Sequence, residues 1–180
     1  MEMSNPLEQL DFFEVDQDRW SDFEKLFESR GGPKNCWCMV WRGKPEDREN
    51  KESKKSAIRK MVQEATPVGI LGYVGDEPIA WCSIAPRSTY RELGGVYEPD
   101  ENPDKVWSLV CFFVSRKYRG HGVMNQLIQA AVEHSRQRGQ PLLKPTLSPP
   151  ILQAIGSWGL FRNLASSDSS KWVQREVGVM

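Results

Sequence analysis

Apolar and polar residues change their spacing several times along the first 64 residues, and each change marks an element. Residues 10–15 predict a short strand. Residues 19–28 predict a helix that Asp18 can cap, with one apolar face made of Trp20, Phe23, Leu26 and Phe27. Charged, helix-forming residues 45–64 predict a second helix, whose buried side near its end is formed by Ala57, Ile58, Met61 and Val62.

The middle of the chain is dominated by strand patterns. Residues 68–74 and 78–85 are separated by Gly75-Asp76-Glu77, which is typical of a hairpin. Residues 106–114 are almost continuously apolar, as in a central strand that is covered on both faces. Apolar residues then recur at helical spacing over residues 122–138, Gly139 ends that helix, and a further strand starts near Pro141.

Composition narrows the class of protein. The chain has 180 residues, the size of one domain, and 24 Lys+Arg against 24 Asp+Glu. This balance provides no field that attracts nucleic acid or a membrane surface. Seven Trp favour a packed globule, no apolar run has the length of a membrane span, and the polar start is unlike a signal peptide. We therefore expect a cytoplasmic protein that binds neither nucleic acid nor membrane.

The cysteine spacing does not favour a metal site or a disulfide framework. Cys82 and Cys111 lie in apolar runs, where a reduced thiol behaves as a small hydrophobe. Cys36-x-Cys38 could be combined with His121 or His134 into a zinc site, but structural zinc sites space their cysteines more widely and need four ligands. We therefore predict no metal; one of the two thiols packs in the core and the other lines a pocket.

The strongest chemical signal is a strand, a turn and a helix in direct succession over residues 112–139. The turn holds Arg119-Gly120-His121-Gly122. Amides in the first turn of a helix have no partners within the helix, and the helix dipole adds positive charge there, so this unit is suited to an anion. Glycines let a phosphate approach the backbone, and Arg119 adds a cation.

Two other phosphate-binding patterns fit less well. A dinucleotide fingerprint needs a third glycine about where Gln126 stands, and it follows a first strand rather than a late one. A P-loop needs Gly-Lys followed by Ser or Thr, which is not found after this turn.

The turn resembles the motif of the GNAT N-acetyltransferases, (Arg/Gln)-x-x-Gly-x-(Gly/Ala), which directly follows the fourth strand of that superfamily. Val114 stands five positions before Arg119 as the motif requires, whereas Met124 replaces the last small residue. The segments CWCMVWR (36–42), WCSIAPR (81–87) and VWSLVCFF (106–113) are similar to an uncharacterised GNAT subgroup. The similarity covers residues 23–139.

The resemblance implies an α/β (α+β) fold with a mixed, mostly antiparallel sheet flanked by helices, and acetyl-CoA as co-substrate. It places the acetyl carbonyl and the pantetheine arm on backbone groups of Phe112 and Val114. The pyrophosphate would bind the turn and the start of the helix at Arg119, Gly120, His121, Gly122, Val123, Met124 and Asn125.

For the acceptor side, the resemblance implies direct attack of a neutral amine on the thioester. The amine belongs to a small molecule or a peptide. We predict that its pocket is lined by Cys36, Trp37, Trp41 and Trp81. Glu77, Glu92 and Glu98 are candidate bases, although each fits a solvated loop charge better, and the general base and general acid stay unassigned.

The sequence changes character after the helix. We predict an acetyltransferase domain over residues 1–142, with its acetyl-CoA core at about 68–139, and an atypical tail over 143–180 that is rich in proline and then in serine. Reading the codons from about Leu143 in a shifted frame permits EAYPVSPDSPSYRELG and later LGFERFEQVGATGSRRH, both similar to the subgroup. The single Trp codon forces Gly at positions 158–159 and 172–173, so we interpret the tail as out of frame and irregular.

Two function classes follow. The chain is either an active acetyltransferase or a CoA-binding protein whose transfer is impaired by Met124 or by the altered tail. A nucleotide-binding redox protein is a more distant third.

Overall fold

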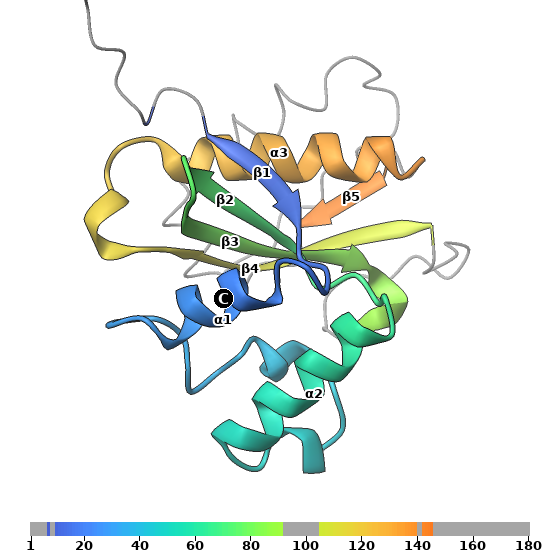
Figure 1. Ribbon diagram of the computed structural model, residues 1–180. Coiled ribbons are helices and arrows are strands. Elements are labelled where there is room, and N and C mark those ends of the chain that lie inside the picture. The colour runs from blue at the N-terminus through green and yellow to red at the C-terminus, as the bar shows by residue number, and fades with distance from the viewer. Residues whose placement is uncertain (1–6, 8–9, 92–104, 140–141, 146–180) are drawn as a thin grey trace, which may run out of the picture. The chain divides into compact units, whose positions relative to one another are not determined.

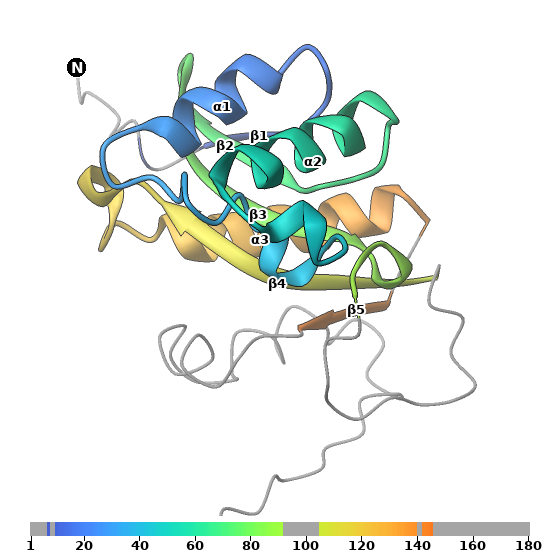
Figure 2. The ribbon, with the colours of Figure 1, turned by 90° about the horizontal axis from the view of Figure 1, so that it is seen from below.

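A computed structural model describes residue 7 and residues 10–91, 105–139 and 142–145, all within the compact unit Met1–Leu147. Five strands form one sheet in the order β1-β2-β3-β4-β5. The strands are β1 Asp11–Glu14, β2 Ile70–Val74, β3 Glu77–Pro86, β4 Val106–Val114 and β5 Leu142–Pro145. Helices α1 Trp20–Glu28 and α2 Lys51–Gln63 cover one face, and α3 Val123–Gln137 covers the other (Figures 1 and 2).

The sheet is mixed and mostly antiparallel, as the sequence predicts. Strands β1 to β4 pair antiparallel in chain order, whereas β5 pairs parallel to β4. Parallel neighbours need a long crossover, and α3 provides it between β4 and β5. The start of α3 therefore lies directly after the end of β4, which is the arrangement that the candidate site requires.

Two helix starts differ from the sequence prediction. Asp18 does not cap α1; Arg19 occupies the N-cap, and its amide donates to Asp16 Oδ1 at 2.9 Å. The second predicted helix, residues 45–64, is divided into the short turn η2 Glu46–Arg48 and α2. The division falls at Asn50, whose side chain accepts the Ser53 amide at 2.8 Å in a capping box that defines a new helix start.

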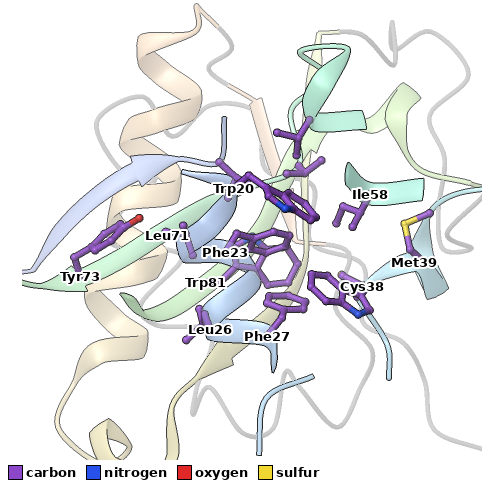
Figure 3. Packing of buried hydrophobic residues seen from close by; sticks show 14 residues of the cluster. Trp20, Phe23, Leu26, Phe27, Cys38, Met39, Ile58, Leu71, Tyr73 and Trp81 are labelled. Carbon is purple, nitrogen blue, oxygen red and sulfur yellow. The ribbon is translucent and has the colours of Figure 1, made fainter. Parts of the chain in front are cut away.

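An aromatic core fills the space between the sheet and the helices α1 and α2 (Figure 3). Phe23 and Phe27 of α1 meet the ring of Trp81 on β3, with centroids 5.6 and 5.1 Å apart. Trp37 stacks on Phe27 at 5.0 Å. Each such ring buries apolar surface worth about 2–3 kcal/mol, so this layer is a main source of stability.

On the opposite face, α3 buries Val123, Leu127, Ile128, Ala131 and Ser135. This stripe follows the helical period that the sequence predicts, and the neighbouring residues Ala130 and His134 are half-buried. Gly139, with φ +70°, follows the C-cap residue Arg138 and ends the helix as predicted.

Several predictions lie outside the described residues. These are Glu92 and Glu98 within residues 92–104, and the irregular tail from residue 146 onward. No helix in the described ranges has both the length and the apolar character that crossing a membrane requires.

Candidate functional site

The turn between β4 and α3 leaves a row of backbone amides open. Gly120 and Gly122 have φ of +79° and +77°, and Gly122 is the N-cap of α3 with no side chain capping it. The first hydrogen bonds of the helix come from the amides of Asn125 and Gln126, which both donate to the Gly122 carbonyl. Within the described residues, the amides from Gly120 to Met124 have no acceptor. Since the helix dipole adds positive charge here, the turn is suited to an anion.

The space over this turn is open as well. A Cβ added to Gly120 or to Gly122 would meet no atom within 4 Å. The two glycines therefore serve the left-handed backbone and leave room for a ligand, rather than a close internal packing contact.

Arg119 is exposed and anchored at the mouth of the turn. Its Nε donates to the Val114 carbonyl at 2.9 Å, which ties the side chain to the end of β4. His121 Nδ1 lies 2.8 Å from the Arg119 carbonyl oxygen and is exposed. This hydrogen bond holds the Arg119 side chain at the end of β4, directly before the open turn.

The short turn η4, Arg116–Tyr118, fastens this unit to the β2–β3 hairpin. Tyr118 donates to Glu77 Oε2 at 2.7 Å, and Lys117 Nζ donates to Tyr118 at 3.0 Å. Glu77, one of the candidate bases, therefore holds a structural hydrogen bond at the edge of the site.

Strand β4 has an irregularity at the point where it leaves β5. Its register with β3 shifts between Leu109 and Cys111, so Val110 is a bulge residue without a partner. The described pairing with β5 runs from Val106 to Leu109 and stops before the bulge. Among the described residues, the second half of β4 therefore has a free edge on its β5 side.

Phe112 and Val114 direct their backbone groups toward this free edge. The Ser115 amide donates to Ile79 at 2.8 Å, which identifies that pair as a hydrogen-bonded one. Because hydrogen-bonded and non-bonded pairs alternate along antiparallel strands, Phe112 and Val114, opposite Cys82 and Ala80, point away from β3. The edge then leads directly into the open turn.

Of the predicted acceptor residues, two belong to the core instead. Trp37 and Trp81 are 0% and 1% exposed and are packed among the rings of α1, so they cannot line an open pocket. The sequence pattern missed this because an aromatic residue looks alike in a core and in a pocket wall. Cys36 and Trp41 keep partly exposed side chains.

Arg42 is a buried residue to which the sequence reasoning assigned no role. It is fully buried, its guanidinium lies 4.0 Å from the Tyr90 ring centroid, and Nη1 donates to the Pro67 carbonyl and Thr89 Oγ1. Nη2 donates to the Val68 carbonyl and to Ser83 Oγ. All these acceptors are uncharged. Since Ser83 lies opposite Cys111, Arg42 ties the segment after Trp41 to the bulged part of the sheet.

In the described part of the chain, neither a metal-binding cluster nor the hollow beside the β1–α1 connection overlaps with this site. No group of three His, Cys, Asp or Glu side chains in the described part of the chain is placed to hold a metal. A hollow of about 470 Å³ lies between the β1–α1 connection, the end of α2 and Arg138, and none of the predicted site residues lines it.

A family match decides what this arrangement belongs to. The acetyltransferase (GNAT) family matches residues 12–144, which run from β1 to β5. The chain belongs to the GNAT acetyltransferase family. It is therefore an acetyltransferase by family, with acetyl-CoA as co-substrate.

Solved structures share the fold of this GNAT acetyltransferase. Aminoglycoside N-acetyltransferase AAC(6')-Iy in complex with CoA gives a TM-score of 0.55 at 16% identity, over 96% of this chain and 94% of that chain. The same enzyme with a bisubstrate analogue gives 0.54 at 17% identity, over 95% and 99%. Aminoglycoside acetyltransferase meta-AAC0020 from an uncultured soil metagenomic sample gives 0.53 at 9% identity, over 98% and 100%. At these identities the likeness concerns the fold. No curated protein compared with the sequence matches it.

The residues of the GNAT turn fit the co-substrate. Open amides, two glycines with free space beside them and a nearby arginine are the kinds of group that can bind a pyrophosphate. Met124, the departure from the family motif, is half-buried in the first turn of α3, and its amide remains among the open ones.

Proposed function

We propose that this GNAT acetyltransferase moves the acetyl group of acetyl-CoA directly to an amine of a small molecule or peptide. The observation that carries the proposal is the continuity between the free edge of β4 and the open turn before α3. Among the described residues, Phe112 and Val114 face the free edge of β4, the amides from Gly120 to Met124 have no acceptor, and no side chain caps α3. An extended ligand with an anionic group at one end and a thioester at the other fits such a path.

In this mechanism, the turn before α3 binds the pyrophosphate of acetyl-CoA, and strand β4 polarises the thioester carbonyl. The amides of Gly120 to Met124, with Arg119, hold the pyrophosphate and so fix the position of the thioester along β4. The Phe112 amide donates to the carbonyl oxygen, which gains negative charge as a neutral amine attacks the carbonyl carbon and the CoA thiolate leaves. Donors that are already oriented need no reorganisation during the reaction, and one such donor contributes roughly 3 kcal/mol.

The acceptor reaches the thioester from the side of the sheet that carries α1, α2 and the segment before η1 (Met39–Trp41). Cys36 and Trp41 are the two predicted pocket residues with partly exposed side chains, and we assign them to its wall. Trp41 lies between the aromatic core and the small cluster of Ala85, Tyr90 and Val110, next to the bulge.

Thermal unfolding and thiol release test the proposal together. We expect saturating acetyl-CoA to raise the melting temperature, because a ligand that binds only the folded chain stabilises it, and NAD to leave it unchanged. A panel of polyamines, aminoglycosides and peptides should then include an amine that accelerates CoA release. Stabilisation without release by any amine would favour the CoA-binding alternative. An unchanged melting curve in a folded protein would contradict both.

The matched variants are Arg119→Glu and Lys25→Glu. Both exchange an exposed cation for an anion, but Lys25 lies on α1 away from the turn. We expect acetyl-CoA affinity to fall by about a hundredfold in the first, through lost attraction and added repulsion, and to stay unchanged in the second.

A further inference from the structure

Cations lie beside both side chains that we assign to the wall of the acceptor pocket, Trp41 and Cys36. The Arg91 guanidinium lies over the Trp41 ring, 6.0 Å from its centroid, and the Arg91 amide donates to the Trp41 carbonyl at 3.1 Å. Lys54 Nζ donates at 3.1 Å to the carbonyl of Asn35, which precedes Cys36 in the chain. Both walls of the pocket therefore have a positive charge nearby.

A third cation, Arg42, follows Trp41 in the chain and is fully buried. Its hydrogen bonds go to uncharged oxygen atoms at 3.1 to 3.4 Å, and its Nε has no partner among the described residues. Burying a guanidinium is costly unless an anion or several dipoles compensate its charge. The dipoles around Arg42 solvate it in part, but they leave its net positive charge in place.

None of these three cations forms an ion pair within the part of the chain that the structure describes. Lys51 and Lys55 of α2, in contrast, pair with Glu28 at 2.9 and 3.3 Å. Residues 30–64 contain ten Lys and Arg against five Asp and Glu, although the charges of the whole chain balance. The acceptor pocket therefore lies in a positive field that attracts an anion.

We propose that the acceptor amine carries a carboxylate, which Arg91 binds beside Trp41 while Lys54 and Arg42 add long-range attraction. This substrate class rests on the proposed function. Arg91 is exposed, so a ligand can contact it directly, and its planar guanidinium can bind a carboxylate through two parallel hydrogen bonds. Arg42 is enclosed and acts through its field alone.

The positive field also suits the attacking group. The amine attacks the thioester in its neutral form, and nearby cations disfavour the protonated form. A carboxylate on the same molecule offsets the repulsion between these cations and the protonated acceptor as it approaches. A polycationic amine such as an aminoglycoside lacks this compensation, and we expect it to be a poor acceptor.

Matched acceptors test the proposal on the full-length protein at saturating acetyl-CoA. Glycine, β-alanine and γ-aminobutyrate place the carboxylate at increasing distance from the amine, and their amides are the uncharged controls. A peptide with a glutamate side chain and its glutamine counterpart distinguish a peptide source from a free amino acid. Rates are compared per concentration of neutral amine, because amidation of the carboxylate lowers the pKa of a nearby amine.

We expect kcat/KM for at least one acid to exceed that of its amide by about tenfold or more. Added salt should reduce this preference, because it screens charges that are open to solvent. Amides that equal or surpass their acids in every pair would overturn the proposal.

Variants identify the cation that makes the contact. Arg91→Gln should lower kcat/KM for the preferred acid by about tenfold, mainly through KM, and leave its amide and the CoA affinity unchanged. Arg91→Lys should restore most of the loss. Lys54→Gln should cause a smaller loss, whereas Lys60→Gln, at an exposed cation of the same helix that pairs with Glu64 at 3.8 Å, should cause none. Equal losses for acid and amide in Arg91→Gln would show a merely structural role and refute the contact.

Binding separates this proposal from the proposed function. Calorimetric titration of the CoA-bound protein with the acids and with the amides requires no acetyl transfer. Acetylation of acids and amides alike would refute the carboxylate preference and leave the proposed function standing. If none of the amines is acetylated, the proposed function fails; tighter binding of the acids would then still support the carboxylate site, and equal binding would refute it as well.

Discussion

The turn between β4 and α3 and the segment from Cys36 to Arg42 each contain one arginine of special interest. Arg119 is exposed, and its side chain has one hydrogen bond to the described part of the protein. Arg42 is fully buried, has four, and lies against the Tyr90 ring. The turn has backbone amide donors without acceptors, whereas most side chains of the segment from Cys36 to Arg42 are packed or hydrogen-bonded inside the protein.

This difference indicates that the turn before α3 serves ligand binding, whereas the Cys36–Arg42 segment serves the stability of the fold. A site for an anion must keep donors unpaired, so it contributes little to folding and is built on an element that is stabilised elsewhere. Residues of the Cys36–Arg42 segment bury rings and fill acceptors, so their substitution affects folding before it affects chemistry. The two regions should therefore respond differently to matched substitutions.

The largest contrast is expected within the Cys36–Arg42 segment itself. Trp37→Ala should lower the free energy of unfolding by about 3–5 kcal/mol, because it removes a fully buried ring from the aromatic core. Trp41→Ala, at a half-buried position, should cost about 1 kcal/mol and mainly reduce acceptor turnover. Urea unfolding and steady-state kinetics measure both, and similar stability losses in the two variants would contradict the distinction between core and pocket wall.

The two arginines come next. Arg42→Met should lower the free energy of unfolding by about 2–4 kcal/mol, because several buried acceptors lose their donor. Arg119→Met should change stability by less than about 0.5 kcal/mol and weaken acetyl-CoA binding about tenfold. Calorimetric titration of both variants decides this; a CoA affinity that Arg42→Met reduces more than Arg119→Met does would reverse the assignment.

Glycine substitutions give a smaller and more specific contrast. Gly122 and Gly31 have similar φ, +77° and +84°, and an added Cβ meets nothing within 4 Å at either position. Changing either to Ala should cost about 1 kcal/mol of backbone strain. Only Gly122→Ala should also weaken acetyl-CoA binding, because its Cβ occupies space beside the open amides. Equal affinities in the two variants would move the pyrophosphate away from this turn.

The smallest effect is expected on α3, away from its binding end. Burial lowers the pKa of His134, with Arg138 acting in the same direction and Glu14 against it. The unfolded chain then binds the proton more readily than the folded one, so the free energy of unfolding should fall as the pH drops below about 6.5. His134→Gln should flatten this part of the profile, which melting curves at several pH values will measure. A slope that the substitution leaves intact would assign it to other groups.

The order of elements could be predicted well from the sequence because the relevant information is local. Periodicity placed β4 at residues 106–114 and α3 within one residue at each end. The glycines and Arg119 of the turn are adjacent in the chain, so the anion-binding unit could be read directly. The capping box at Asn50 is equally local and could have been found from the spacing of Asn50 and Ser53.

Only the tertiary structure determined which side chains are buried in the core and which remain accessible to solvent. Arg42 finds its acceptors 25 to 47 positions away, on segments that no local pattern connects to it. Trp37 and Trp41 stand four residues apart with the same chemistry, yet one is enclosed and the other is half-buried. Local spacing specifies elements, whereas burial and the bulge at Val110 arise from long-range packing. The turn before α3 could be predicted from the sequence, because a helix end suited to an anion requires no distant partner in the chain. The packing on the α1/α2 side of the sheet could not be predicted, because the environment of each side chain there depends on residues far away in the sequence.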